Sequence, residues 1–309
     1  MAAAGRLERV GGERVARERQ ALRVARPGPA AAPWPVRVYL AYEPTVLGVV
    51  SVVLVLVVWE GLARGWWADL LAPALGPAAE RWRVNPIFLS SPTAVARAAY
   101  RLVATGELWR HLGVSALEFA AGFSLAVAVG IPTGLAAGWY RRLRYALEPF
   151  LAALNATPRV ALLPLVIIWV GIGLASKILI VFLGAAIPIC MSALAGVRAT
   201  DARLLRVARS FGASRRQLFR TVILPGSIPF LLAGLRLGVG RAMVGIVVGE
   251  LVAATAGIGF LIHESGAAFR TDRVFVGIVV IALAGALLTE ALAALERRVE
   301  RWRPKVGAG

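Results

Sequence analysis

Six long apolar runs restrict what this chain can fold into. They cover residues 46–59, 113–138, 150–170, 178–197, 228–252 and 274–295. Several approach the ~20 apolar residues that a helix needs to cross the ~30 Å hydrocarbon core of a bilayer. A backbone inside lipid must satisfy its own hydrogen bonds, which a helix does within one segment. The sequence therefore predicts an all-α integral membrane protein with about six transmembrane helices.

The composition agrees with a membrane location. Apolar residues make up 59% of the 309 residues, and the mean hydropathy is +0.72. A net charge of +18 would by itself suit nucleic-acid binding, but the basic residues lie between and outside the apolar runs. That distribution is typical of the positive-inside rule, which sets the orientation of membrane helices. We therefore expect a lipid bilayer around the chain and no nucleic-acid partner.

Positive charge alternates between successive connections. The two terminal tails and the connections at 139–149 and 198–221 are basic, whereas the connections at 171–177 and 253–273 are not. Because Lys and Arg favour the cytoplasmic side, we expect both termini in the cytoplasm. The predicted location is the bacterial plasma (inner) membrane, with several passes.

The first connection, 63–112, departs from this alternation. Its basic residues, which would lie outside, are Arg81, Arg83, Arg97, Arg101 and Arg110. The connection is long enough for the charge rule to weaken. Within it, Ser91-Pro92 is a plausible start for a helix that lies on the outer surface.

The chain divides into four regions. Residues 1–43, rich in Ala, Arg, Gly and Pro, are expected to form a disordered basic cytoplasmic tail. Residues 44–112 hold the first span and an outer interfacial segment. Residues 113–303 form the core transmembrane domain, with a cytoplasmic loop at 198–221, and residues 304–309 form a C-terminal tail.

Few residues suit catalysis or metal binding. Cys190 is the single cysteine, and neither His111 nor His263 has cysteine partners at metal-ligand spacing. The short set Gly257-Ile258-Gly259 is not a nucleotide-binding fingerprint, because no strand precedes it, and no Walker P-loop occurs. We expect no catalytic residue, metal or cofactor, so any ATP must be hydrolysed by another polypeptide.

The segment between the fourth and fifth apolar runs is rich in arginine and interrupted by glycine. Thr200 or Asp201 can cap a helix from Ala202, and Gly212 suits the end of that helix. A second helix is expected from Ser214. After Gly212, nine residues lead to the sequence VILP at 222–225. An ordinary positive-inside loop is the alternative interpretation.

This segment resembles the cytoplasmic EAA loop of bacterial ABC importer permeases (pattern E-A-A-x3-G-x9-I-x-L-P). Over roughly 88–304 the chain resembles the nitrate, sulfonate and taurine branch of those permeases. The stretches that carry the resemblance are FLSSP at 88–92, GELW at 106–109, LLPLVIIWVGIG at 162–173, SKI at 176–178, ARSFGA at 208–213, ILPG at 223–226, GLR at 234–236 and GIGFL at 257–261. Arg206 and Val207 replace the glutamate and first alanine of the EAA pattern, whereas Ala208 keeps the second alanine.

The resemblance implies an ABC importer permease of the MetI-like fold. It implies a homodimer, two cytoplasmic ATPase subunits that bind ATP, and an outer solute-binding protein. The implied solute is small and anionic, of the sulfonate, nitrate, taurine or bicarbonate type. The residues implied to contact the ATPase are Arg206, Ala208, Arg209, Phe211, Gly212, Ala213, Leu224 and Pro225.

Four ionisable residues within the runs are candidates for a substrate pathway. They are Arg159, Arg236, Arg241 and Glu250. Charges at membrane depth are costly and usually face a cavity or a partner. Arg241 is a candidate to attract an anion, and an ion pair with Glu250 or a neighbouring chain is the alternative. Snorkelling at a proline-broken helix start is the alternative for Arg159.

Two other functional classes remain open. An ion-coupled secondary transporter would have the same spans but would not require the Gly212 loop or an ATPase. A lipid-modifying intramembrane enzyme would need clustered catalytic groups near one interface, and two separated histidines with one cysteine do not supply them.

Overall fold

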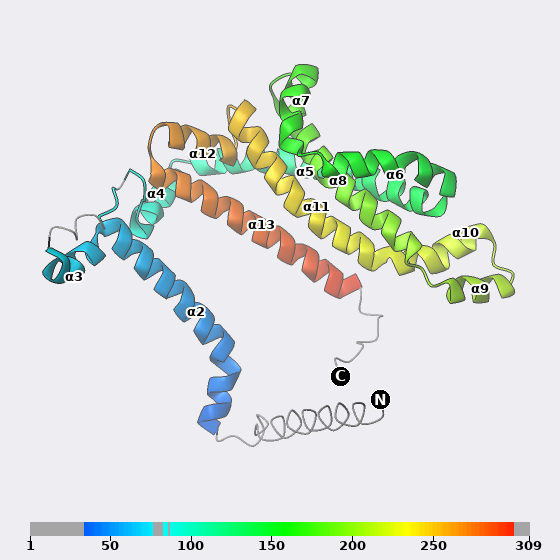
Figure 1. The fold of residues 1–309 in the computed structure, drawn as a ribbon, viewed down its shortest axis with the longest axis horizontal. Helices are drawn as coiled ribbons and strands as arrows, with labels where there is room; N and C mark the ends of the chain where they lie inside the picture. Colours follow the sequence, from blue (N-terminus) through cyan, green and yellow to red (C-terminus); the bar gives the residue numbers. More distant parts are fainter. Residues whose placement is uncertain (1–33, 77–82, 86, 300–309) are drawn as a thin grey trace, which may run out of the picture. The chain divides into compact units, whose positions relative to one another are not determined.

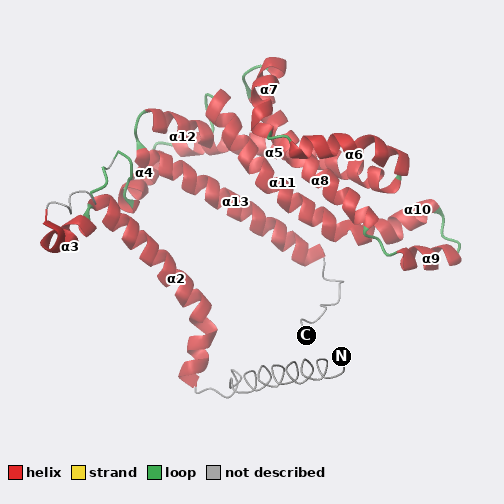
Figure 2. Cartoon of the chain, in the orientation of Figure 1, coloured by secondary structure: helices red, strands yellow, loops and turns green. Residues whose placement is uncertain are grey.

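The computed structural model describes residues 34–76, 83–85 and 87–299 (Figure 1). All regular secondary structure in these ranges is helical (Figure 2). The chain separates into two compact units, residues 1–82 and 83–309. Of the two predicted tails, residues 1–33 and 304–309 lie outside the described residues.

The first unit contains α2 (Trp34–Arg64) and α3 (Trp66–Leu75). Helix α2 begins at Trp34, inside the segment that was expected to be part of the tail. From residue 46 to 58 its Val and Leu side chains are exposed, as expected for a helix that faces lipid. Gly65, in the left-handed conformation, turns the chain into α3, where the indole of Trp67 donates to the carbonyl of Val58 at 3.2 Å.

Four long helices form the frame of the second unit. They are α5 (Glu107–Trp139), α8 (Leu174–Arg198), α11 (Leu224–Ala253) and α13 (Thr271–Val299). Helix α8 packs along both α5 and α11 (Figure 1). The core between these three helices is built mainly from small and β-branched residues: Ala126, Val181, Ala185, Ala186, Ile189, Ala242 and Ile246.

Glycines let α5 approach α8 closely. A Cβ on Gly130 would lie 2.9 Å from the carbonyl oxygen of Ala186, and one on Gly138 would lie 2.5 Å from Cβ of Val197. Such distances require a neighbour to move, so larger residues would push the helices apart. The four-residue glycine spacing in this run therefore serves helix packing.

Shorter helices connect the frame. They are α4 (Pro92–Ala104), α6 (Arg141–Ala156), η2 (Arg159–Leu162), α7 (Leu163–Val170), α9 (Ala202–Ser210), α10 (Arg215–Leu218), η3 (Phe219–Ile223) and α12 (Ile258–Ala267). Helix α4 starts as predicted, with Pro92 in its first turn and the Ser91 hydroxyl accepting from the Ala94 amide at 3.3 Å.

Five helices of the described residues are long and apolar enough to cross a membrane, and a bent pair would make six. The bent pair is Arg141–Ala156 with Val160–Val170, and its angle is 94°. The apolar run 150–170 is therefore not one continuous helix. Pro158 explains the break, because the residue before a proline avoids the helical conformation, and Thr157 is extended with ψ 127°.

Candidate functional site

The loop between α8 and α11 folds into the two short helices that its sequence predicts. The Asp201 side chain caps α9 by accepting from the Arg203 amide at 2.7 Å. Ser214 and Gln217 form a capping box at α10: the Ser214 amide donates to the Gln217 side chain at 2.8 Å, and the Gln217 amide donates to the Ser214 hydroxyl at 3.4 Å. These bonds satisfy amide groups that a helix start leaves free.

Gly212 makes the turn between the two helices. Its φ of +76° lies in the left-handed region, which favours glycine. Its amide donates to the Arg209 carbonyl at 2.9 Å, and the Ala213 amide donates to the Ala208 carbonyl at 3.1 Å. A Cβ on Gly212 would meet no atom within 4 Å, so the requirement for glycine is conformational.

Helix α9 presents apolar and basic side chains that the second unit does not cover. None of its residues is buried. Phe211, which follows it, is 86% exposed, and Leu204 and Val207 are 57% and 54% exposed. Arg206 and Arg209 are exposed on the same short helix. An exposed apolar patch with a charged rim is typical of a surface that binds a protein partner.

The other half of the loop is anchored to the core. Leu218 is buried, and the Phe219 ring contacts the Trp139 ring edge-on at 5.7 Å between centroids. From Phe219 the chain continues through one π-helical turn into α11, where Pro225 occupies the first turn. We call the segment from α9 to Pro225 the α9–α10 loop. The loop connects an exposed surface directly to α11, which is second in length to α5 among the described helices of the second unit.

The four ionisable candidates within the spans do not form one group. Arg236 pairs with Glu296 and thereby joins α11 to α13. Arg159 begins η2. Glu250 is 1% exposed and does not pair with Arg241.

Arg241 lines a cavity of about 200 Å³ between η2, α7, α8 and α11. The other lining residues are Pro158, Val160, Leu163, Ile180, Gly184, Val244, Gly245 and Val248. Arg241 is the only charged residue among them, and it has no ion-pair partner in the described part of the chain. A guanidinium in apolar surroundings can hold an anion through several hydrogen bonds.

A buried polar cluster joins three of the long helices, and it consists of His111, Ser115, Glu118, Lys177 and Glu250. The Lys177 ammonium lies 3.1 Å from the Glu118 carboxyl group. Glu250 accepts from the Ser115 hydroxyl at 2.5 Å and from the Gly259 amide at 2.6 Å. Lys177 is therefore a core residue of α8, although the apolar runs place it at the end of the connection 171–177.

The sequence holds a signal for part of this cluster. His111, Ser115 and Glu118 are four and three residues apart, a spacing that places them on one face of a helix. Polar residues at that spacing within an apolar helix indicate a polar neighbour. Which residues form that neighbour is a matter of tertiary structure.

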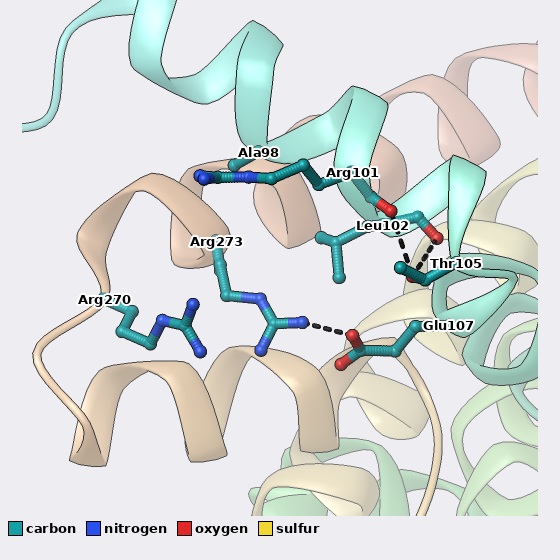
Figure 3. A pocket seen from close by; sticks show the side chains of 7 residues that line it. All are labelled: Ala98, Arg101, Leu102, Thr105, Glu107, Arg270 and Arg273. Atoms are coloured by element: carbon teal, nitrogen blue, oxygen red, sulfur yellow. Dashed lines mark hydrogen bonds and ion pairs between the residues drawn. The ribbon is translucent and has the colours of Figure 1, made fainter.

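A basic pocket lies where α4, the start of α5 and the start of α13 meet (Figure 3). Its volume is about 140 Å³. Arg273 reaches across it and pairs with Glu107, whereas Arg101 pairs with Asp272 at 3.4 Å. Arg270 also lines the pocket and has no ion-pair partner among the described residues. The pocket thus keeps one uncompensated positive charge.

Comparisons with known proteins agree on one kind of protein. The family described as binding-protein-dependent transport system inner membrane component matches residues 130–301. The chain is 40% identical over 228 residues to the taurine transport system permease protein TauC of Escherichia coli (strain K12), covering 72% of this chain and 83% of TauC. It is 35% identical over 246 residues to SsuC of Bacillus subtilis (strain 168), whose name assigns it to aliphatic sulfonates transport, covering 77% of this chain and 88% of SsuC.

The fold has a counterpart among solved structures. A chain of the inward-facing MetNI methionine ABC transporter superposes with a TM-score of 0.56 at 20% sequence identity. The superposition covers 63% of this chain and 96% of that chain. The helical arrangement is therefore that of an ABC importer permease, of the MetI-like fold predicted from the sequence.

Proposed function

The chain belongs to the binding-protein-dependent transport system inner membrane components, and we propose that it works as a homodimer driven by two cytoplasmic ATPase subunits. It is a multi-pass permease subunit of an ABC importer. Transport, and not chemical conversion of the solute, is its task. The ATPase partner, the dimer and the solute are the parts that we propose.

The exposed α9–α10 loop is the observation that carries the ATPase assignment. Helix α9 and Phe211 form a protruding surface without cover in the second unit, and Gly212 sets the turn that presents it. The loop leads into α11 without a flexible break. A subunit that binds α9 and changes shape with ATP would therefore move α11. An ion-coupled secondary transporter would have no use for such a surface.

The charge of α9 indicates the kind of groove that binds it. Arg203, Arg206 and Arg209 are spaced by three residues, and all three are exposed. Where the EAA pattern has an acidic residue, this chain has Arg206. We therefore expect an acidic rim on the ATPase groove, because complementary charges specify a partner and speed its association.

The proposed orientation follows from this contact. The α9–α10 loop is cytoplasmic, together with both termini and the basic start of α6. Helix α11 starts at the loop and ends at Ala253, so the basic pocket near the start of α13 lies on the outer face. Its Arg270, for which the described part of the chain holds no ion-pair partner, suits an acidic side chain on the solute-binding protein.

The proposed solute is a small sulfonate or a related anion. TauC and SsuC carry the names of taurine and aliphatic sulfonates transport. In this chain the cavity at Arg241 combines one guanidinium with apolar walls. That combination suits a small molecule with an oxyanion and a short carbon chain.

The test is purification of the tagged permease from its native membrane, followed by reconstitution in vesicles. We expect an ATPase with a P-loop to copurify in stoichiometric amount. We also expect taurine uptake to require both ATP and the solute-binding protein. Uptake by the permease alone, driven by an ion gradient, would overturn the proposal.

A further inference from the structure

We infer that Glu250 is a positioning residue that ties α11 to the outer turn formed by Gly257, Ile258 and Gly259. Through this contact, movement that enters at the α9–α10 loop reaches the outer face of the permease. The inference rests on the proposed function for the source of that movement. The contact itself rests on the geometry of the buried polar cluster alone.

The carboxyl group of Glu250 bridges two elements besides its own helix. One oxygen accepts from the Ser115 hydroxyl of α5 at 2.5 Å. The other accepts from the Gly259 amide in the first turn of α12 at 2.6 Å. The side chain is 1% exposed, so water does not compete for these bonds.

All three amides of the outer turn donate to side chains of the buried polar cluster. The Gly257 amide donates to Nδ1 of His111 at 3.1 Å, and the Ile258 amide donates to the Ser115 hydroxyl at 2.9 Å. With Gly259 bonded to Glu250, three of the four amides that a helix start leaves free are satisfied at α12. Negative partial charge on Glu250 is also favourable at the start of a helix.

This arrangement explains the two glycines, which the sequence alone did not. A Cβ on Gly257 would overlap the carboxyl group of Glu250, and the φ of +121° there is strained for other residues. A Cβ on Gly259 would lie 2.7 Å from both Cβ of Glu250 and the Val247 carbonyl oxygen. The turn is therefore shaped to admit this one side chain.

Helix α11 connects the contact to the cytoplasmic surface. It runs unbroken from Leu224 to Ala253, and a helix of 30 residues is roughly 45 Å long. The α9–α10 loop joins its first residue, and Glu250 lies in its last turn. A displacement of the loop would thus be carried along a stiff element to the outer turn.

One carboxyl oxygen in the buried polar cluster is free to take a new hydrogen-bond donor from within the described residues. Oε2 of Glu118 is buried and accepts no hydrogen bond from the residues that the structure describes, while the other oxygen pairs with Lys177. Buried polar atoms are nearly always bonded, so this oxygen is the atom of the cluster most open to a new donor. A second arrangement of the cluster, in which Oε2 gains a donor, would accompany release of the outer turn.

The experiment measures exposure of the outer turn directly. Cys190→Ala removes the only cysteine, and Ile258→Cys, at a residue now 3% exposed, supplies a reporter in the turn. The permease, with copurified ATPase in lipid nanodiscs, is labelled with a water-soluble maleimide, without nucleotide and with trapped ATP–vanadate. In the parent we expect slow labelling without nucleotide and a different rate when ATP is trapped.

Ser115→Ala removes one bond to Glu250 and one to Ile258, with Ser265→Ala as its matched control. Ser265 is 2% exposed, whereas Ser115 is partly buried, and the Ser265 hydroxyl has no hydrogen-bond partner among the described residues. Ser115→Ala should raise the basal labelling rate roughly tenfold, as loss of a hydrogen bond to a carboxyl group allows. It should also abolish the nucleotide-dependent difference and reduce uptake, while ATPase copurification stays normal. Ser265→Ala should match the parent.

Gly259→Ala is the independent second variant, and Gly266→Ala in the same helix is its control, since a Cβ there meets only Val274 at 4.0 Å. Unchanged labelling and uptake in both Ser115→Ala and Gly259→Ala would overturn the inference. Loss of uptake in these variants with a normal nucleotide-dependent difference in labelling rate would also overturn it. If the parent copurified no ATPase, the proposed function would fail, yet the basal labelling contrast would still report on the Glu250 contact.

Discussion

The Lys177 ammonium lies 3.1 Å from the Glu118 carboxyl group inside the helical core, and the two side chains are 6% and 1% exposed. The pair joins α8 to α5 in the helical core, where an unpaired charge is expensive. The intact pair adds little net stability to the fold. Removing only one partner is costly, because it leaves the other as an unpaired buried charge.

Lys177→Met should accordingly destabilise the permease by about 3–5 kcal/mol. The double variant Lys177→Met/Glu118→Gln should recover most of this loss, because neither member of the pair then leaves a charged partner behind. Thermal unfolding of the solubilised protein, followed by gel filtration, measures both. If single and double variants were equally unstable, the role of Lys177 would be packing and not charge pairing.

Gly212→Val should separate folding from coupling. A β-branched residue in the left-handed region costs about 1–3 kcal/mol, which favours another shape of the turn. Since a Cβ at Gly212 would meet no atom within 4 Å, the core packing is untouched, and the loss of thermal stability should not exceed this cost. Copurified ATPase and ATP-dependent uptake should both fall. Gly212→Asn, which tolerates this conformation, is the control and should retain both.

Phe211→Ala tests the exposed apolar surface of the loop. The ring is 86% exposed, so its removal should not alter the stability of the free permease. If the ring fills a pocket on the ATPase, the variant should weaken association by about 2 kcal/mol, or roughly 30-fold in Kd. Tyr100→Ala removes a ring of similar exposure, 74%, from α4 and should leave ATPase binding intact. Equal effects of both variants would argue against a specific contact.

Arg241 and Arg236 lie on the same helix but should respond differently to replacement by Gln. Arg241→Gln removes the charge from the cavity, so sulfonate uptake should fall by roughly ten- to a hundredfold while thermal stability is kept. Arg236→Gln breaks the pair with Glu296 and should mainly lower stability. Uptake assays and thermal unfolding of both variants show whether each arginine serves transport or stability. A stability loss in Arg241→Gln with uptake unchanged would identify it as a structural residue.

Arg270→Glu should impair docking of the solute-binding protein. Reversing the unpaired charge of the basic pocket should slow association on the order of tenfold at low salt, with a smaller effect at high salt. Surface plasmon resonance with the permease in nanodiscs gives the rate. Arg110→Glu, an exposed arginine outside the pocket, controls for net charge. If it slowed docking equally, the effect would not belong to the pocket.

The local features of the loop were predictable from sequence. The caps at Asp201 and Ser214 and the left-handed turn at Gly212 depend on residues at most a few positions apart. The spans were predictable too, because length and apolarity alone decide what crosses a bilayer. The break at Pro158 altered one of them, since a proline overrides an apolar run that otherwise reads as one helix.

The partners of the residues that hold charge inside the core could not be assigned from sequence. Lys177 looked like a loop charge, and Glu250 looked like a partner for Arg241 or part of a pathway. Both interpretations used only the position of each residue along the chain. Glu118 lies 59 residues from Lys177 in sequence, and Ser115 lies 135 residues from Glu250. No periodicity within one helix reports such distant partners.

By itself, therefore, the sequence determined a helical membrane protein with about six spans and a protruding loop, because hydrophobicity, capping and turn preferences act locally. Only the tertiary structure decided that Gly257 and Gly259 surround Glu250, that Arg236 is paired, and that Arg241 has no ion-pair partner among the described residues. The physical reason is that a buried polar group is defined by what surrounds it. Those surroundings come from helices that are distant in the chain and adjacent only after packing.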